Sequence, residues 1–381
     1  MNLRNKFLAT RWILPGRVVA LVLTSLAFAA PLSNLRSADG TSTEPDLRSP
    51  NNPRTDFLVG ADISWVPQQE AQGRHFSVDG VKRDLLKILK EHNFNAIRLR
   101  IFVDPTAPGG YSTNGFCGRE ATLAMARRVK AEGFHFLLDF HFSDTWADPA
   151  HQKKPAAWRE LDFAGLTNAV FQYTRETLSE FKRQGLTPDI VQVGNEISNG
   201  LLWPDGKLDN FDRAAVLLAA GIRGVREATP SAKVMLHLAW GGQNEKSRWF
   251  LDNAMKRGLD FDLIGQSYYP RWHGTLEELK LNLTDLATRY RQGIIVVEYS
   301  TPLVREVNEI VRSLPGEKGL GTFIWEPTHP AHGNLFDRDG HALPVLQEYR
   351  ALAGSLPSKN DARPASGEGH VESLKEGGRQ L

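Results

Sequence analysis

Two glutamates at the ends of short apolar runs are the residues in this sequence best suited to acid–base chemistry. Ile190–Val193 is followed, after one glycine, by Asn195 and Glu196, and the apolar run at residues 293–297 leads directly into Glu298. Runs rich in β-branched residues are typical of buried strands. A carboxylate at the mouth of such a strand needs water, a charged partner or a catalytic role, because burying it unpaired is costly.

Two carboxylates that face one cleft are the groups that cleave glycosidic bonds. One carboxyl group stays protonated and gives its proton to the leaving oxygen, while the other attacks the sugar or activates water. Glutamates about 5 Å apart would retain the anomeric configuration. We expect Glu196 to be the acid and Glu298 the nucleophile, with Arg98 and Tyr268 keeping Glu298 ionised and oriented. Asn195 is placed to hydrogen-bond a sugar 2-hydroxyl group.

The scaffold must bring these distant strand ends together, and the sequence alternates between strand-like and helix-like segments. The expected strands cover residues 57–62, 96–101, 134–140, 190–193, 233–238, 261–266, 293–298 and 319–325. The expected helices cover residues 80–92, 119–132, 167–184, 212–228, 247–257, 275–290 and 304–314, with a short one near 343–353. Eight such units predict an α/β fold, a single (β/α)₈ TIM barrel at residues 56–354.

An open, doubly wound sheet is the alternative architecture. It would place a glycine-rich phosphate-binding turn after the first strand, where the sequence instead reads Ala61-Asp62-Ile63-Ser64-Trp65. The barrel is therefore favoured, and its active site is expected at the C-terminal ends of the strands.

The expected strand ends and the loops that follow them are rich in polar and aromatic residues, whereas the strand bodies are apolar. Any single polar residue there could simply be a hydrogen-bonded structural group at the mouth of the barrel, but the whole series indicates a binding cleft. Tryptophan rings pack against the apolar faces of sugars, although tryptophan is also a common core residue. The residues expected to contact substrate are Asp62, Arg98, Arg100, His141, Asp144, Trp146, Asn195, His237, Tyr268, Trp272 and Trp325.

A rival carboxylate and two candidate metal sites were weighed. Glu326 follows Trp325, and side-chain alternation along a strand directs it away from that tryptophan, so it ranks below the other two glutamates. The spacing of the histidines and aspartates within residues 141–151 matches no zinc motif, and residues 205–210 lack the terminal glutamate of a calcium loop. We therefore expect no metal and no cofactor.

The two ends of the chain differ in composition from the predicted barrel. Residues 1–29 resemble a signal peptide, with basic residues before an apolar run at 18–30 that is short for a membrane span; an uncleaved anchor is the alternative. Residues 30–55 are predicted to be a flexible linker and residues 355–381 a disordered polar tail. These features predict a secreted or periplasmic protein with no stable membrane association after signal cleavage.

The overall charge and the cysteine count exclude several classes of protein. Lys and Arg total 46 against 44 for Asp and Glu, which argues against a nucleic-acid partner. Cys117 is the single cysteine, so no intrachain disulfide can form. We expect a monomer whose partner is a polysaccharide substrate.

The ordered motifs at these strand ends resemble glycoside hydrolase family 53, the endo-β-1,4-galactanases. The resemblance extends over about residues 56–353, and its most specific stretch is DFHFSDTWADP at residues 139–149. The other matching stretches are at residues 60–64, 97–100, 103–105, 191–197, 267–270, 272–276, 297–298, 319–321 and 325–327. The resemblance implies a retaining enzyme that cleaves β-1,4-galactan in type I arabinogalactan, with Glu196 as acid/base and Glu298 as nucleophile.

The sequence also departs from the family pattern in the loops that shape the sugar subsites. The segment at residues 299–303 is short where family members usually carry a longer, aromatic-rich loop, and Arg271 stands where an apolar or aromatic residue is expected. The loop that carries calcium in some bacterial relatives has no evident counterpart. A retaining hydrolase acting on another β-linked polysaccharide, or a non-catalytic sugar-binding barrel, therefore remain as alternatives.

Overall fold

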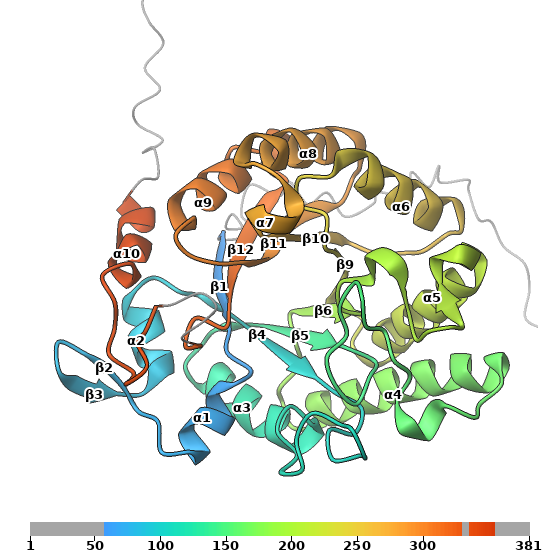
Figure 1. The fold of residues 1–381 in the computed structure, drawn as a ribbon, viewed down its shortest axis with the longest axis horizontal. Helices are drawn as coiled ribbons and strands as arrows, with labels where there is room; N and C mark the ends of the chain where they lie inside the picture. Colours follow the sequence, from blue (N-terminus) through green and yellow to red (C-terminus); the bar gives the residue numbers. More distant parts are fainter. Residues whose placement is uncertain (1–56, 330–334, 355–381) are drawn as a thin grey trace, which may run out of the picture. The chain divides into compact units, whose positions relative to one another are not determined.

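Eight parallel strands close into a barrel, as the sequence predicts (Figure 1). The first and last of them, β1 and β12, pair in parallel and complete the closure. The barrel strands are β1 (Leu58–Asp62), β4 (Ala96–Ile101), β5 (His135–Phe140), β6 (Ile190–Val193), β9 (Lys233–Leu238), β10 (Leu263–Tyr268), β11 (Gly293–Tyr299) and β12 (Gly319–Trp325).

This computed structural model describes residues 57–329 and 335–354. The signal peptide, linker and polar tail expected at residues 1–29, 30–55 and 355–381 lie outside the described residues. Within the described ranges, no helix is both long and apolar enough to cross a membrane.

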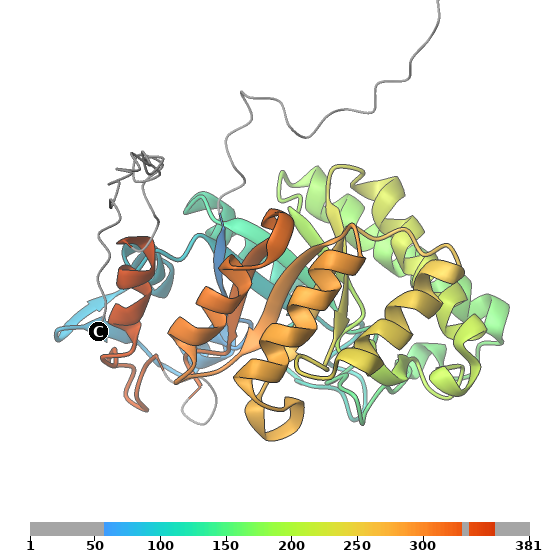
Figure 2. The same cartoon turned by 90° about the horizontal axis from the view of Figure 1, so that it is seen from above.

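Helices surround the barrel and cover the outer side of its strands (Figures 1 and 2). The α-helices are α1 (Val66–Ala71), α2 (Leu85–Glu91), α3 (Arg119–Ala131), α4 (Phe163–Arg183), α5 (Phe211–Ala228), α6 (Asn244–Lys256), α7 (Pro270–His273), α8 (Leu276–Arg289), α9 (Val304–Arg312) and α10 (Leu346–Gly354). Side-chain caps fix several helix starts. Asp162 accepts a hydrogen bond from the Gly165 amide at the start of α4, and Thr275 with Glu278 forms a capping box on α8.

The predicted helix at residues 80–92 is wrong in its first turn. Residues there instead form a hairpin of β2 (Phe76–Val78) and β3 (Val81–Arg83), and α2 begins only after Asp84 caps it. The cause is the Asp79-Gly80 pair, whose φ angles of 51° and 76° suit the two-residue turn of a hairpin. Val81, expected on an apolar helix face, is 53% exposed.

Short elements follow β6 and other strands. A second hairpin consists of β7 (Gly200–Leu201) and β8 (Gly206–Lys207). Single 3₁₀ turns cover η1 (Ala156–Trp158), η2 (Ile197–Asn199), η3 (Leu208–Asn210) and η4 (Pro315–Glu317). The 3₁₀ turn η2 follows β6 and begins immediately after Glu196.

Apolar side chains fill the barrel interior below the polar strand ends. One buried cluster combines a residue from each of seven strands with a second residue of β11: Ala96, Leu137, Ile190, Met235, Leu263, Ile295, Val297 and Phe323. The remaining strand, β1, contributes Gly60, where a Cβ atom would lie 2.2 Å from the Phe323 ring. A glycine is therefore required at this position for the barrel to close around that ring.

Candidate active site

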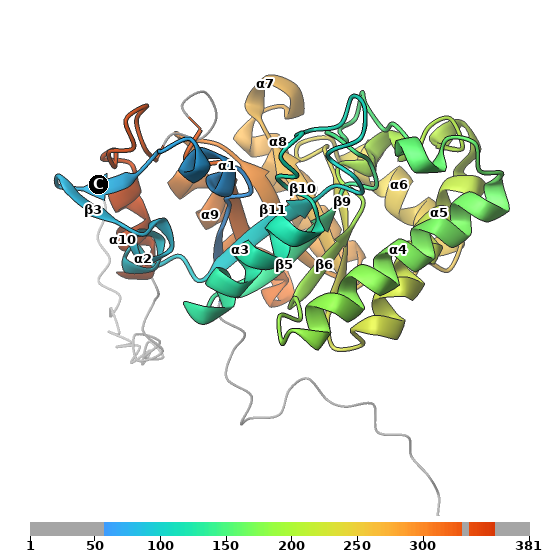
Figure 3. The same ribbon diagram turned by 90° about the horizontal axis from the view of Figure 1, so that it is seen from below.

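A cleft of about 840 Å³ lies at the C-terminal ends of the barrel strands, where the fold predicts an active site. Both Glu196 and Glu298 line it. Helix α7 and the loop after β5 lie at the same end of the barrel (Figure 3), and both contribute to the cleft wall. The two glutamates therefore share one cavity, although Glu196 follows β6 and Glu298 lies in β11, three β/α units later in the sequence.

A β-bulge near the end of β11 directs Glu298 into the cleft. Ile295 and Val297 both belong to the interior cluster, so strict alternation would turn Glu298 to the outside of the barrel. The pairing of β10 with β11 instead shifts register between Gln266 and Ser267, and Ser267 pairs with Glu298. A bulge of this kind places two consecutive residues on the same side of a strand.

Glu298 is held by two donors, one charged and one neutral. Arg98 Nη1 lies 2.8 Å from Glu298 Oε1, and the Tyr269 hydroxyl donates to Oε2 at 3.1 Å. The expected contact with Tyr268 is wrong, because the Tyr268 hydroxyl donates to the Gly274 carbonyl instead. Alternation along β10 explains the exchange: Ser267 and Tyr269 point to the inside of the barrel, where Tyr269 lines the cleft, and Tyr268 between them packs in the outer core.

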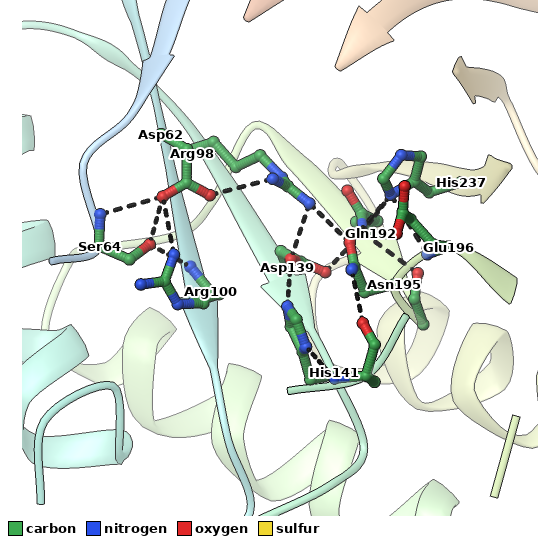
Figure 4. A network of polar contacts seen from close by, with 12 residues as sticks. Asp62, Ser64, Arg98, Arg100, Asp139, His141, Gln192, Asn195, Glu196 and His237 are labelled. Atoms are coloured by element: carbon green, nitrogen blue, oxygen red, sulfur yellow. Dashed lines mark hydrogen bonds and ion pairs between the residues drawn. The ribbon is translucent and has the colours of Figure 1, made fainter. Parts of the chain in front are cut away.

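Arg98 is a buried cation shared among several acceptors (Figure 4). Its guanidinium contacts Asp62 Oδ2 at 3.0 Å, Asp139 Oδ2 at 2.8 Å and Asn195 Oδ1 at 2.8 Å. The surrounding carboxylates raise the pKa of Arg98 above its usual value despite burial, so it stays charged beside Glu298.

Glu196 has a different environment. It follows β6 in the left-handed region at φ 43°, and its Oε1 accepts a hydrogen bond of 2.8 Å from the Ser267 hydroxyl. Burial of its carboxyl group and the negative charge of Glu298 raise the pKa of Glu196 to about 8. Burial also raises the pKa of Glu298, but the Arg98 guanidinium acts against that rise. Glu298 is thus the one of the pair placed to ionise first.

Asn195 lies at the cleft with both ends of its amide oriented. Its Oδ1 accepts from Arg98, and its Nδ2 donates to the Ala147 carbonyl at 2.8 Å. That bond uses one of the two amide hydrogens, so the other is available to a sugar hydroxyl. His141 also lines the cleft; its Nε2 lies 3.0 Å from Asp139 Oδ2, and its Nδ1 accepts from the Ala147 amide.

Three residues expected to contact substrate lie off the cleft surface: Asp144, His237 and Tyr268. Asp144 holds the surrounding loops, since its oxygens accept from the Asp104 amide at 3.0 Å and the Ala156 amide at 2.7 Å. His237 is fully buried beneath Asn195 and Glu196, and its ring reaches Ser267. The other eight expected contact residues do line the cleft: Asp62, Arg98, Arg100, His141, Trp146, Asn195, Trp272 and Trp325.

Arg100 supports an aromatic wall on one side of the cleft. The rings of Trp65, Trp146 and Trp325 lie with their centroids 5.7 to 6.1 Å apart. The Arg100 guanidinium carbon is 4.2 Å from the Trp146 ring centroid and 5.4 Å from that of Trp65. On α7 a further ring, Trp272, is 65% exposed. These faces give the cleft an apolar surface suited to sugar rings.

Glu326 supports this aromatic wall through its contacts with Arg100 and Trp65, and it does not line the cleft. Its Oε1 accepts from Arg100 Nη1 at 2.5 Å and from the Trp65 amide at 3.1 Å, and its side chain is fully buried. Burial raises the pKa of Glu326 to about 8, but no cleft surface is open to it. Side-chain alternation predicted that Glu326 points away from Trp325, and the structure agrees, since Trp325 lines the cleft and Glu326 does not.

Sequence reasoning missed Ser267, Gln192 and the contact made by Tyr269. The strand expected at residues 261–266 continues to Tyr268, so Ser267 appeared to lie beyond it. Gln192 lies within the β6 run and looked like a strand residue, yet its Nε2 lies 2.5 Å from Asp139 Oδ1. A correct strand end with alternation would have identified Ser267 and Tyr269.

No metal-binding group is evident around the cleft in residues 57–329 and 335–354. In those ranges the histidine and carboxylate atoms close enough to share an ion belong to Asp337, Asp339 and His341, which are not cleft residues. Asp148 and His151 do line the cleft, and they pair with each other at 2.9 Å.

Replacing Tyr269 with phenylalanine tests its contact with Glu298. A hydrogen bond to a charged group contributes about 1.5–3 kcal/mol, so Tyr269→Phe should lower kcat by about 10- to 100-fold. Tyr268→Phe is the matched control, because its hydroxyl binds the Gly274 carbonyl away from Glu298. Steady-state kinetics on the two purified variants would separate them. Equal losses in both would contradict the assignment of the contact to Tyr269.

Comparison with known proteins shows the family of this chain. The profile described as glycosyl hydrolase family 53 matches residues 58–306, which include both cleft glutamates. The chain belongs to glycosyl hydrolase family 53. The protein is therefore a glycoside hydrolase by family.

Relatives in this family span most of the chain. A Niallia circulans protein named "Uncharacterized protein in bgaB 5'region" is 38% identical over 80% of this chain and 96% of its own length. A "Probable arabinogalactan endo-beta-1,4-galactanase A" of Aspergillus fumigatus is 36% identical over 70% of this chain and 83% of its own. The solved "Ignisphaera aggregans GH53 catalytic domain" matches with a TM-score of 0.73 at 34% identity, covering 80% of this chain and 98% of its own.

Proposed function

We propose that this family 53 member is a retaining endo-β-1,4-galactanase, with Glu196 as acid/base and Glu298 as nucleophile. One observation carries the proposal: the two glutamates share a cleft, but among residues 57–329 and 335–354 only Glu298 of the pair contacts a guanidinium. Glu196, whose pKa is raised to about 8, keeps its proton at neutral pH. The cleft therefore holds one acid and one carboxylate at the same time, as glycosidic cleavage needs.

The reaction proceeds in two displacements. In the first, the Glu298 carboxylate attacks the anomeric carbon, the bond to the leaving oxygen breaks, and that oxygen takes the proton of Glu196. In the second, Glu196 takes a proton from water, the water oxygen attacks the same carbon, and the bond to Glu298 breaks. Two inversions at one carbon give net retention.

The electrostatics of the pair support this change of role. The negative charge of Glu298 is one of the causes that raise the pKa of Glu196. That charge disappears when Glu298 becomes a glycosyl ester, so the pKa of Glu196 falls and its carboxyl group ionises. Glu196 is then a base when water must be activated. Arg98 stays charged throughout and receives the Glu298 carboxylate again when it is released.

Galactan is proposed as the substrate because the relatives of this chain include a protein named as a probable arabinogalactan endo-β-1,4-galactanase. The tryptophan wall offers sugar-ring platforms beside the glutamates, and Trp272 offers another on α7. Such platforms along an open cleft support binding within a chain, hence endo-cleavage.

Product analysis on purified β-1,4-galactan tests the proposal. We expect short galacto-oligosaccharides early in the reaction, with the β-anomer of the new reducing end appearing first by proton NMR. An α-anomer first would reject the retaining mechanism. Activity on a β-mannan or β-glucan but not on galactan would favour the alternative substrate class. The short segment after Glu298 makes that comparison informative.

We also propose that the enzyme is exported, to the periplasm or the medium, and acts as a monomer. The basic and apolar pattern within residues 1–30 supports export. N-terminal sequencing of the protein from its native host, with light scattering of the purified enzyme, tests both points. A protein retained in the cytoplasm with Met1 intact would overturn export, and a stable dimer would overturn the monomer.

A further inference from the structure

We propose that Ser267, held by His237, is a positioning residue that stabilises the ionised form of Glu196 and so enables the second displacement. This inference rests on the proposed roles of the two glutamates. Neither side chain can contact a sugar bound in the cleft, because both are fully buried and neither lines the cleft. They act through Glu196.

The contacts form a chain that leads from the acid/base into the barrel. The Ser267 hydroxyl lies 2.8 Å from Glu196 Oε1, and on its other side it lies 2.8 Å from His237 Nε2. Alternation along β10 turns Ser267 to the inside of the barrel, as it does Gly265, and the β10–β11 register shift pairs Ser267 with Glu298. Where these two residues pair, the Glu298 side chain lies in the cleft and the Ser267 hydroxyl lies against Glu196.

The two glutamates differ in what supports their negative charge. Glu298 has the Arg98 guanidinium and the Tyr269 hydroxyl. Among the contacts of the described residues, the side-chain donor to Glu196 is the Ser267 hydroxyl. An ionised carboxylate at a desolvated site depends strongly on such a donor. Glu196 must ionise for half of the catalytic cycle, so the loss of Ser267 should affect that half most.

His237 decides where the single hydroxyl hydrogen of Ser267 goes. With a hydrogen on Nε2, the ring donates to Ser267, and the serine must give its own hydrogen to Glu196. The other ring nitrogen, Nδ1, can then accept from the Gln192 amide at 3.1 Å or from the Glu196 backbone amide at 3.4 Å. This arrangement directs Ser267 toward the carboxylate.

The opposite tautomer also finds partners. Nδ1 lies 2.9 Å from Asn195 Oδ1, to which it can donate, and Nε2 would then accept the Ser267 hydrogen. Ser267 would in turn accept a hydrogen from protonated Glu196. Glu196, Ser267 and His237 therefore have a complete hydrogen-bond arrangement whether Glu196 is protonated or ionised. Burial and the nearby Arg98 charge lower the pKa of His237 well below its usual value, so the ring stays neutral in both.

Ser267→Ala tests the proposal through the pKa of Glu196. Removing the hydroxyl should raise that pKa by about one unit, because the hydrogen bond that the ionised form loses is charge-assisted and stronger than the one that the protonated form loses. ¹³C NMR titration of labelled glutamate side chains measures the shift without substrate. Ser247→Ala is the matched control: Ser247 is also buried and contacts Gln266, the neighbour of Ser267, but on the outer side of β10.

Kinetics give an independent readout of the second displacement. With a nitrophenyl β-1,4-galactobioside, whose leaving group needs no acid, Ser267→Ala should turn over about tenfold more slowly because deglycosylation limits the rate. Azide attacks the glycosyl-enzyme without a base, so it should restore the rate. Ser267→Thr, which keeps the hydroxyl, should recover most of the wild-type rate.

The outcomes separate this inference from the proposed function. An unchanged Glu196 titration in Ser267→Ala, or an equal loss on all substrates without azide rescue, would overturn the role of Ser267. If Ser267→Ala does not fold, Ser267→Cys keeps the side-chain size with a weaker donor and should show a smaller shift in the same direction. Failure of the wild-type enzyme to cleave galactan would reject the proposed substrate but leave the NMR test of Ser267 intact.

Discussion

Glu298→Gln should abolish galactan cleavage, with a fall in kcat/KM of at least about 10⁴-fold, or about 5.4 kcal/mol of transition-state stabilisation. The amide keeps the size of the side chain but cannot attack the anomeric carbon. Arg98 retains Asp62 at 3.0 Å and Asp139 at 2.8 Å, so its charge stays compensated. We therefore expect a folded protein with a Tm close to that of the wild type.

Reducing-sugar release from galactan and circular dichroism together check this result. Glu309→Gln is the matched control, because it makes the same chemical change at an exposed position on α9. Its activity should equal that of the wild type. Substantial galactan cleavage by Glu298→Gln, in protein free of wild-type enzyme, would remove Glu298 from the role of nucleophile.

Glu196→Gln should have an effect that depends on the leaving group. General acid–base catalysis contributes about 10²- to 10⁴-fold, and galactan, with a poor leaving group, should lose about that much. A nitrophenyl galactobioside needs no proton to depart, so formation of the glycosyl-enzyme should be nearly unaffected. Added azide should then speed turnover by replacing the water that Glu196 would activate. An equal loss on both substrates, with no effect of azide, would argue against an acid/base role.

The pH profile provides a second check on Glu196. The acid must be protonated in the free enzyme, so kcat/KM of the wild type should fall as the pH rises through about 8, the raised pKa of Glu196. Glutamine does not titrate, so Glu196→Gln should lose this alkaline limb while keeping any acid limb due to Glu298. An alkaline limb that persists unchanged in the variant would belong to another group.

The sequence was sufficient to predict the barrel and the strand positions of its two central glutamates. Each strand core is a short apolar run, and polar or aromatic residues gather at and just beyond the strand ends, so periodicity and position were enough to order the eight strands. The pairing of Glu196 with Glu298 followed from their places after the fourth and seventh strands. These features depend on local pattern, which a single sequence carries.

The tertiary structure decided which neighbouring side chains contact the two glutamates. Tyr269 contacts Glu298 where Tyr268 was expected, and Ser267 was not expected at all. A one-residue shift in register turns every later side chain to the other face, and local sequence does not fix the register of a strand end. The bulge that turns Glu298 inward has the same origin, since it depends on how β10 and β11 pair.

The electrostatic division of labour is likewise a property of the folded chain. Sequence reasoning ordered Glu196 as acid and Glu298 as nucleophile from the neighbours it expected for Glu298, and the resemblance to a family implied the same order. Arg98 reaches Glu298 from a strand about 200 residues earlier in the sequence, at 2.8 Å. Interaction energies between charges depend on distance and burial, and both are set only when the strands close into a barrel. The sequence by itself therefore determined which groups are present, and the closed barrel determined that Glu298 is the glutamate in contact with the Arg98 guanidinium.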